Sequence, residues 1–402
     1  MRRAPSPAAL FTAPFNALFT LPSAAVFPAV LLAVLLTVSL LGTTPAAASV
    51  SLPAMPVRLG DKDPCTAAST QTATAASWAQ QSLGLPRAWQ LTRGAGVTVG
   101  VVDTGVAPGA AALSGRVTTV GAASEDCVGH GSFVAGLVAA GPTGSTAFEG
   151  VAPQARVLAV RGTNARGTAT AGRVADGIRT AVDHGAQVVL VAAALADGED
   201  ELTAAVGYAT RHDVLVVAPA APDVTNWSDS TEPARYWPAA APGALSVLGV
   251  TADGTPLDSA RKVTRAALAA PGGGVVSIGA RGTGHYLGAG SSLAAAFTAG
   301  AAALVRAYHP DLTAAQVAGR LTASAAPAGL APRLDPYAAV SMVPGSQAAA
   351  RVRPAGAVHI ALPSDGPRQR ALWAAGGALL LVVVVAAALV VTPKGRARGW
   401  RP

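Results

Sequence analysis

The segment Gly96-Val97-Thr98-Val99-Gly100-Val101-Val102-Asp103-Thr104-Gly105 decides the fold predicted for this chain of 402 residues. Its valine-rich run starts after a glycine and ends at an aspartate, which is typical of a short strand buried on both faces. Runs of the same kind recur further along the chain, at residues 156–160, 187–192, 214–218 and 244–250.

Segments with helical periodicity lie between and after these predicted strands. In residues 173–184, apolar side chains recur every fourth residue, and two more helices are predicted over residues 293–308 and 312–322. Alternation of strands and helices predicts an α/β fold with a mostly parallel sheet between two helical layers. Such sheets place their chemistry beyond the carboxyl ends of the strands, where Asp103 lies.

The composition narrows the class of protein. With 51% hydrophobic residues, 12% charged residues and two cysteines, the chain is neither disordered nor a small disulfide framework. The net charge is +8, but six of the cations behind it lie at the two ends of the chain: Arg2, Arg3, Lys394, Arg396, Arg398 and Arg401. No basic stripe with aromatic residues remains, so we expect no nucleic-acid partner.

Two apolar segments predict the compartment. Residues 1–48 resemble a signal peptide, with an apolar run at 26–41 and small residues up to Ala48; an uncleaved signal anchor is the alternative. Residues 371–392 carry no charge and are long enough to cross a bilayer as a helix. The basic tail at 393–402 favours a cytoplasmic C-terminus, so the preceding residues lie outside the cytoplasm in a membrane-anchored protein.

The two cysteines fit that compartment. In an oxidising space Cys65 and Cys127 can form one intramolecular disulfide, and two free thiols are the alternative.

Three short motifs carry residues suited to nucleophilic catalysis. Asp103 follows a predicted strand, His130 lies in Gly129-His130-Gly131-Ser132, and Ser292 lies in Gly290-Ser291-Ser292 before an alanine-rich helix. A serine hydroxyl needs an imidazole to accept its proton, and the imidazole needs a carboxylate to orient it.

These motifs, in the order Asp, His, Ser, resemble the catalytic signatures of the subtilisin-like serine proteases. The resemblance implies a three-layer α/β/α subtilisin-like domain at residues 78–342. It is preceded by an N-terminal extension (49–77) and followed by a stalk (343–370) and one C-terminal transmembrane helix.

The terminal segments and Cys127, three residues before His130, further resemble the mycosin branch of that family. That resemblance implies a peptide or protein substrate, a type VII secretion membrane complex as partner, and a Cys65–Cys127 bridge that holds the N-terminal arm near the cleft.

The chain departs from the family pattern at the accessory positions. The asparagine that donates to the oxyanion in subtilases falls on Pro222, which has no donor, while Asn226 lies four residues further on and is an alternative donor. Residues 192–194 are alanines where the family has a Ser-x-Gly strand end, and Ser291 replaces a threonine.

Two functions remain open from the sequence. The first is a serine endopeptidase in which Asp103, His130 and Ser292 act as a triad weakened by the missing oxyanion donor. The second is a catalytically impaired pseudoprotease that serves as a structural part of a secretion complex. An esterase is disfavoured because no suitable acid and base follow Ser292. The sequence shows no metal-binding or phosphate-binding motif, so we expect no cofactor.

Overall fold

The computed structural model describes residues 51–144, 148–223, 235–260, 263, 265–343 and 366–399. It divides into two units, residues 1–342 and 343–402. The predicted signal peptide, most of the predicted stalk and Asn226 lie outside the described residues.

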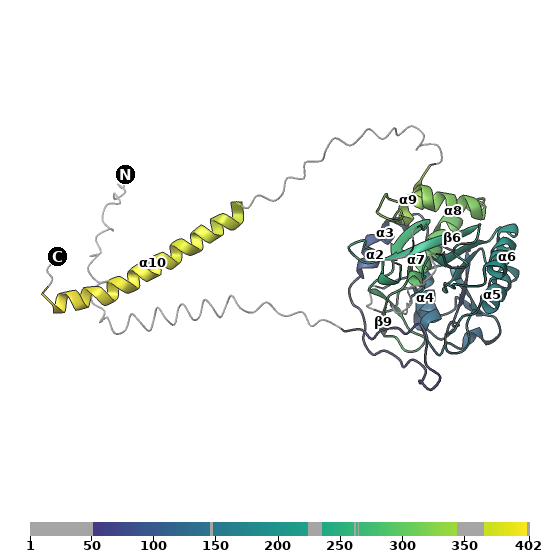
Figure 1. The fold of residues 1–402 in the computed structure, drawn as a ribbon, viewed down its shortest axis with the longest axis horizontal. Helices are drawn as coiled ribbons and strands as arrows, with labels where there is room; N and C mark the ends of the chain where they lie inside the picture. Colours follow the sequence, from purple (N-terminus) through teal and green to yellow (C-terminus); the bar gives the residue numbers. More distant parts are fainter. Residues whose placement is uncertain are drawn as a thin grey trace, which may run out of the picture. The chain divides into compact units, whose positions relative to one another are not determined.

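A seven-stranded parallel sheet forms the centre of the first unit within the described residues (Figure 1). Its order is β2-β3-β1-β4-β5-β6-β7, so β1 lies between β3 and β4. The strands are β1 (Thr98–Asp103), β2 (Val117–Thr119), β3 (Arg156–Arg161), β4 (Val188–Val191), β5 (Leu215–Pro219), β6 (Ala244–Val250) and β7 (Leu268–Pro271). Strands β2 and β3 lie on one side of β1, and β4 to β7 lie on the other. A change of direction of this kind in the strand order opens a crevice at the carboxyl ends of the strands.

Each central strand is buried on both faces, which explains its continuous valine-rich sequence. Val99 and Val101 belong to the apolar core on one face of the sheet, whereas Val102 belongs to the core on the other face. The first core packs against α4 (His130–Ala139) and α7 (Ser291–Tyr308), and the second against α5 (Ala171–Asp183) and α6 (Glu199–Arg211). The predicted three-layer α/β/α architecture is therefore confirmed.

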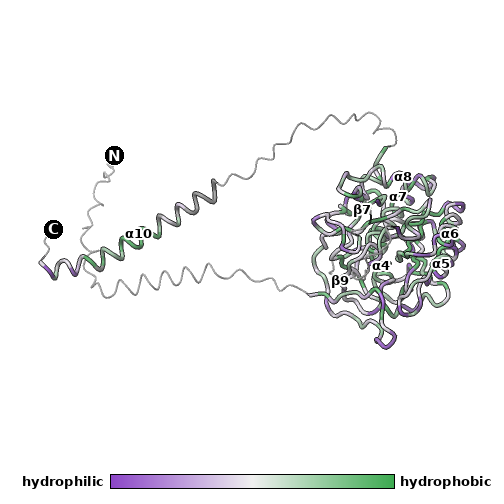
Figure 2. Tube along the Cα trace, viewed as in Figure 1, coloured by the Kyte–Doolittle hydropathy of each residue, from purple (hydrophilic) through white to green (hydrophobic). Residues whose placement is uncertain are grey.

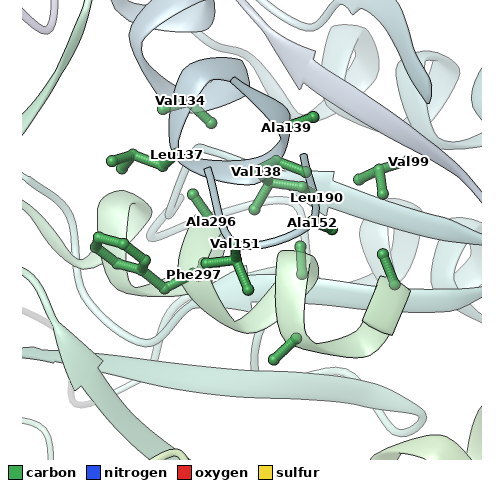
Figure 3. Close-up of a cluster of buried hydrophobic side chains, with 14 of the residues drawn as sticks. Val99, Val134, Leu137, Val138, Ala139, Val151, Ala152, Leu190, Ala296 and Phe297 are labelled. Carbon is green, nitrogen blue, oxygen red and sulfur yellow. The ribbon is translucent and has the colours of Figure 1, made fainter. Parts of the chain in front are cut away.

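Small side chains allow α4 and α7 to pack closely beneath the sheet. The first sixteen residues of α7 are all buried, and many of them are alanines. Figure 3 shows Ala296 and Phe297 of this region facing Val134, Leu137 and Val138 of α4. A residue with a larger side chain in this interface would overpack it.

The five strands and three helices predicted from the sequence are confirmed to within about two residues at each end, the usual uncertainty of helix and strand ends. The sequence did not predict α6, the edge strands β2 and β7, or an antiparallel pair formed by β8 (Val275–Ile278) and β9 (His285–Gly288). The shorter elements are α2 (Trp78–Ser82), α3 (Leu85–Ala88), α8 (Ala314–Ala323), α9 (Pro336–Ser341) and the 3-10 helices Ala111–Leu113, Gly121–Ser124 and Asp258–Ala260.

The second unit contains one long helix, α10 (Gly366–Ala397). Its segment Ala378–Gly395 has a mean hydropathy of 2.3 and is long and apolar enough to cross a membrane by length and composition. Figure 2 shows this apolar stretch, with hydrophilic residues toward the C-terminal end.

Candidate active site

Asp103 is the last residue of β1 and points into the crevice at the carboxyl edge of the sheet. Its Oδ1 accepts a hydrogen bond from the backbone N–H of Thr104 at 2.7 Å. The residue is 4% exposed, so its Oδ2 atom faces the protein interior rather than bulk water.

His130 is the first residue of α4, and its imidazole lies against Asp103. Nδ1 of His130 is 2.7 Å from Oδ2 of Asp103, within hydrogen-bond distance. The preceding residue, Gly129, has a φ of 90°, a left-handed conformation that favours glycine and turns the chain into the helix. The carboxylate therefore fixes both the orientation of the ring and the nitrogen that carries its proton.

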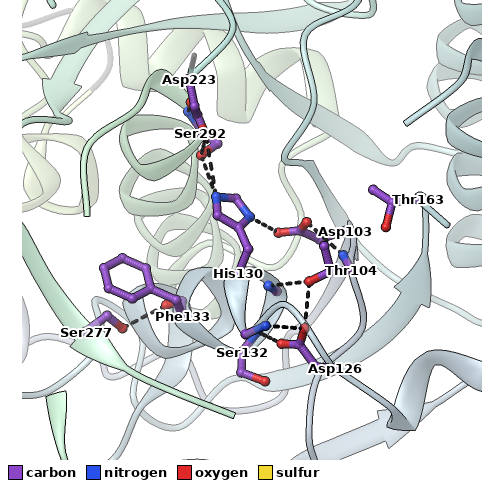
Figure 4. A network of polar contacts seen from close by, with 12 residues as sticks. Asp103, Thr104, Asp126, His130, Ser132, Phe133, Thr163, Asp223, Ser277 and Ser292 are labelled. Carbon is purple, nitrogen blue, oxygen red and sulfur yellow. Dashed lines mark hydrogen bonds and ion pairs between the residues drawn. The ribbon is translucent and has the colours of Figure 1, made fainter. Parts of the chain in front are cut away.

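A second buried carboxylate, Asp126, holds the loop after β1 against the turn that precedes α4 (Figure 4). Its Oδ1 accepts from the Thr104 hydroxyl at 2.8 Å and from the backbone N–H of Gly129 at 2.7 Å. Its Oδ2 accepts from the backbone N–H of Ser132 at 2.8 Å. Asp126 thereby joins the loop after β1 to the start of α4, on either side of His130. The sequence analysis missed this residue, although it lies next to Cys127.

Ser292 is the second residue of α7, and its hydroxyl reaches the other side of the imidazole. Its Oγ is 3.4 Å from Nε2 of His130. This distance is longer than an ordinary hydrogen bond, as is common in free enzymes whose catalytic bonds tighten on substrate binding. The neighbouring Ser291 is structural, since its hydroxyl accepts the backbone N–H of Gly249 at 3.1 Å.

The structure thus brings together the three residues predicted for catalysis, Asp103, His130 and Ser292. Figure 4 shows them in line, with the imidazole between the carboxylate and the hydroxyl.

Asp223, which the sequence analysis did not select, also contacts Ser292. Its Oδ1 accepts from the backbone N–H of Ser292 at 2.9 Å, and its Oδ2 accepts from the Ser292 hydroxyl at 2.5 Å. Its Oδ2 is also 3.4 Å from Nε2 of His130, and the side chain is 4% exposed.

Asp223, and not Pro222, carries the side chain at the predicted oxyanion position. Strand β5 ends with Pro219 paired to Val247, and the backbone N–H of Ala220 donates to the carbonyl of Val247 at 2.7 Å as the last bond of that ladder. The loop that follows brings the residue after Pro222 to Ser292. The side chain at this position carries no N–H donor, since a carboxyl group has none.

The two carboxylates on either side of His130 dominate its electrostatics. Burial alone lowers the pKa of His130, but the charges and hydrogen bonds of Asp103 and then of Asp223 hold that pKa well above its ordinary value. The imidazole is therefore a stronger base here than a histidine in water.

A cleft of about 200 Å³ opens beside these residues. Its wall is built from loops that follow β1, β3, β4 and β5, including Asp103, Thr163, Pro222 and the alanines 192–194. Val57 and Arg58 of the N-terminal arm line the same cleft.

A disulfide fastens this arm beside the site. The sulfur atoms of Cys65 and Cys127 are 2.07 Å apart, and the Thr66 hydroxyl donates to the carbonyl of Val128 at 2.6 Å. The Arg166 guanidinium also donates to two backbone carbonyls of the arm, those of Asp61 and Asp63.

No metal or cofactor is implied by this arrangement. Within the part of the chain that the structure describes, no cluster of three or more His, Cys, Asp or Glu side chains could hold a metal ion.

Comparison with known proteins defines the class. Residues 94–351 match the model of the subtilase family, and this match covers more than half of the chain. The chain belongs to the subtilase family, whose members are serine endopeptidases.

Within that family the similarity extends to the mycosins, as the sequence predicted. The chain is 32% identical to mycosin-3 of Mycobacterium tuberculosis over 313 residues, 61% of this chain and 66% of that protein. It is 34% identical to mycosin-4 of the same organism over 346 residues, 72% of this chain and 75% of that protein.

Solved structures give the same result. The MycP3 protease of the type VII (ESX-3) secretion system matches with a TM-score of 0.57 and 32% identity over 73% of this chain and 98% of that one. MycP1, described as an essential component of the type VII (ESX-1) secretion system, matches with a TM-score of 0.59 and 28% identity over 73% and 97%.

Proposed function

We propose that this protein is a membrane-anchored, extracytoplasmic serine endopeptidase linked to type VII protein secretion. The observation that carries the proposal is the line from Asp103 through His130 to Ser292, with 2.7 Å and 3.4 Å between the facing atoms. Membership of the subtilase family supports the reaction class.

Each residue of the line has one role. Ser292 Oγ attacks the carbonyl carbon of a peptide bond while its proton passes to Nε2 of His130. Asp103 stabilises the imidazolium that forms, and His130 then donates the proton to the leaving amine. Water, activated by the same imidazole, hydrolyses the acyl-enzyme and restores the serine.

The cleft favours an extended peptide as substrate. The alanines 192–194 follow β4 and line the edge of the cleft with small side chains. An extended substrate would pair with such an edge as an added strand.

Helix α10 supports the membrane anchor. Its apolar segment Ala378–Gly395 is followed by further cationic residues, which favour a cytoplasmic C-terminus. The peptidase unit then lies outside the cytoplasm, where a disulfide between Cys65 and Cys127 persists.

The link to secretion rests on relatives. Besides MycP1 and MycP3, the periplasmic assembly from the ESX-5 inner membrane complex matches with a TM-score of 0.57 and 26% identity. By analogy, this chain would associate with a type VII secretion membrane complex, and its substrate would be a peptide or protein handled there.

One observation favours the alternative of a catalytically impaired, structural component. The Ser292 hydroxyl is 2.5 Å from a carboxylate oxygen of Asp223 but 3.4 Å from His130. A nucleophile that donates to a carboxylate is not donating to its base.

Labelling of the full chain in detergent micelles with a fluorophosphonate probe separates the two functions. The endopeptidase predicts labelling that Ser292→Ala abolishes and that Ser291→Ala, a matched change at the adjacent structural serine, retains. Absence of Ser292-dependent labelling at every pH would exclude the endopeptidase and leave the structural role.

A further inference from the structure

The Asp223 carboxylate occupies the place where a tetrahedral intermediate would put its negative oxygen. A donor to such an oxygen lies about 2.7–3.1 Å from it, and the backbone N–H of Ser292 is 2.9 Å from Oδ1 of Asp223. The other oxygen of the carboxylate accepts from the nucleophile itself. An ionised Asp223 therefore fills the oxyanion hole and binds the attacking hydroxyl.

The position of Asp223 is built into the surrounding structure. A Cβ atom at Gly290 would lie 2.2 Å from Cγ of Asp223, so only glycine leaves room for the carboxylate. Figure 4 shows Asp223 beside Ser292 and across from the imidazole of His130.

We propose that Asp223 is the side-chain oxyanion-hole residue of this peptidase and that it acts only in its protonated form, so that the enzyme works in a limited pH window and is inhibited above it. The inference rests on the endopeptidase function proposed above. It gives Asp223 a role at the position where the family has an asparagine donor and this chain has none.

In the active form, Asp223 carries a proton and His130 is neutral. Attack forms the bond between Ser292 Oγ and the carbonyl carbon, moves the hydroxyl proton to His130, and moves the carbonyl π electrons onto oxygen. That oxygen displaces the carboxyl from the Ser292 N–H and accepts from both this N–H and the Asp223 O–H. Asp223 keeps its proton while the C–N bond breaks and His130 protonates the amine.

The active form holds the same number of protons as an inactive one. A single proton shared by His130 and Asp223 gives either a neutral imidazole with a carboxylic acid, which is active, or an imidazolium with a carboxylate, which is not. A further proton removes the base, and loss of the proton removes the oxyanion donor. Coupled groups of this kind give a bell-shaped dependence of rate on pH.

Other charged groups around the pair set where this window lies. From β1, Asp103 faces Nδ1 of His130, and from the loop before α4, Asp126 holds the backbone on both sides of the ring. From the N-terminal arm, Arg58 is the one permanent cation among the described residues that line the cleft. From α7, Ser292 is the neutral contact of Asp223.

The test measures the rate constant for fluorophosphonate labelling of the full chain in detergent micelles, from about pH 5 to about pH 10. We expect a bell for the natural chain. Asp223→Asn supplies a permanent N–H donor, so its rate should rise to an alkaline plateau about 10²-fold above the natural chain at high pH. Its acid limb should lie at the same pH as that of the natural chain or higher, because at that limb a proton removes the base His130 while the side chain at position 223 is neutral in both chains.

Two further variants control the result. Asp223→Ala lacks both donor and acceptor, so it should lose the alkaline limb without the gain in rate. Asp176→Asn changes an exposed carboxylate whose partner is Arg179, and it should keep both limbs.

The outcomes separate this inference from the peptidase function. Ser292-dependent labelling of the natural chain that rises to the same alkaline plateau as Asp223→Asn would overturn the role of Asp223 and leave the peptidase standing. No Ser292-dependent labelling in the natural chain or in Asp223→Asn would overturn both. Labelling that appears only in Asp223→Asn supports an oxyanion hole closed by the carboxylate.

Discussion

Replacing Asp126 by alanine tests whether the loops around His130 depend on one buried carboxylate. In the structure this side chain accepts three hydrogen bonds, from the Thr104 hydroxyl and from the backbone N–H groups of Gly129 and Ser132. The hydroxyl can rotate to another acceptor, but the two backbone donors cannot. Each buried donor without a partner costs about 1–3 kcal/mol, so we expect Asp126→Ala to lower the free energy of unfolding by about 2–6 kcal/mol.

The assay is pulse proteolysis of the full chain in urea, which reports the fraction folded in detergent micelles. Asp126→Asn keeps one acceptor oxygen and should lose about half as much. Asp176→Ala removes an exposed partner of Arg179 and should change the free energy by less than about 1 kcal/mol. A loss for Asp126→Ala no larger than that of Asp176→Ala would show that the carboxylate does not hold these loops.

Three other predictions follow from described contacts. Replacing both Cys65 and Cys127 by serine opens a loop with a sequence separation of 62 residues and should cost about 4 kcal/mol of stability in urea unfolding; an unchanged midpoint would show that the reduced chain keeps the arm in place. The pKa of His130 in the folded chain lies well above its unfolded value, so its stabilising effect is full below about pH 6.5 and is lost as pH rises through the folded pKa. Between about pH 6 and about pH 9, the urea midpoint of the natural chain should therefore fall more than that of His130→Gln. Parallel curves for the two chains would contradict this. Gly290→Ala should destabilise by about 1–3 kcal/mol through overlap with Asp223, and adding Asp223→Ala should recover most of that loss; additive effects of the two changes would argue against the overlap.

The sheet was predictable from the sequence because its central strands are buried on both faces. Such strands are runs of valine, as in β1 and β4, and their bounds were found to within about two residues. The hairpin of β8 and β9 was missed because its strands are four residues each and contain polar residues such as His285. Helix α6 was missed because its first turn carries three acidic residues, which resemble a solvated loop.

The contacts between Asp103, His130 and Ser292 could be expected from the sequence, but the acidic side chains around them could not. Asp103, His130 and Ser292 lie in short motifs whose residue types are dictated by the chemistry, so the sequence identifies them without a structure. The positions of Asp126 and Asp223 depend on how far loops run before they turn, which is a tertiary property. The loop after β5 brings Asp223 rather than Pro222 to Ser292, and no local sequence pattern indicates this.

The burial of α7 has a consequence for how this enzyme can diversify. Ser292 lies at the start of a helix whose first sixteen residues are all buried, so larger side chains on that helix would disturb the scaffold before they altered selectivity. The loops after β3 and β4 line the cleft and are less completely buried. Sequence changes that alter which peptides are recognised should therefore accumulate in those loops, while the side-chain volumes along α7 stay almost constant.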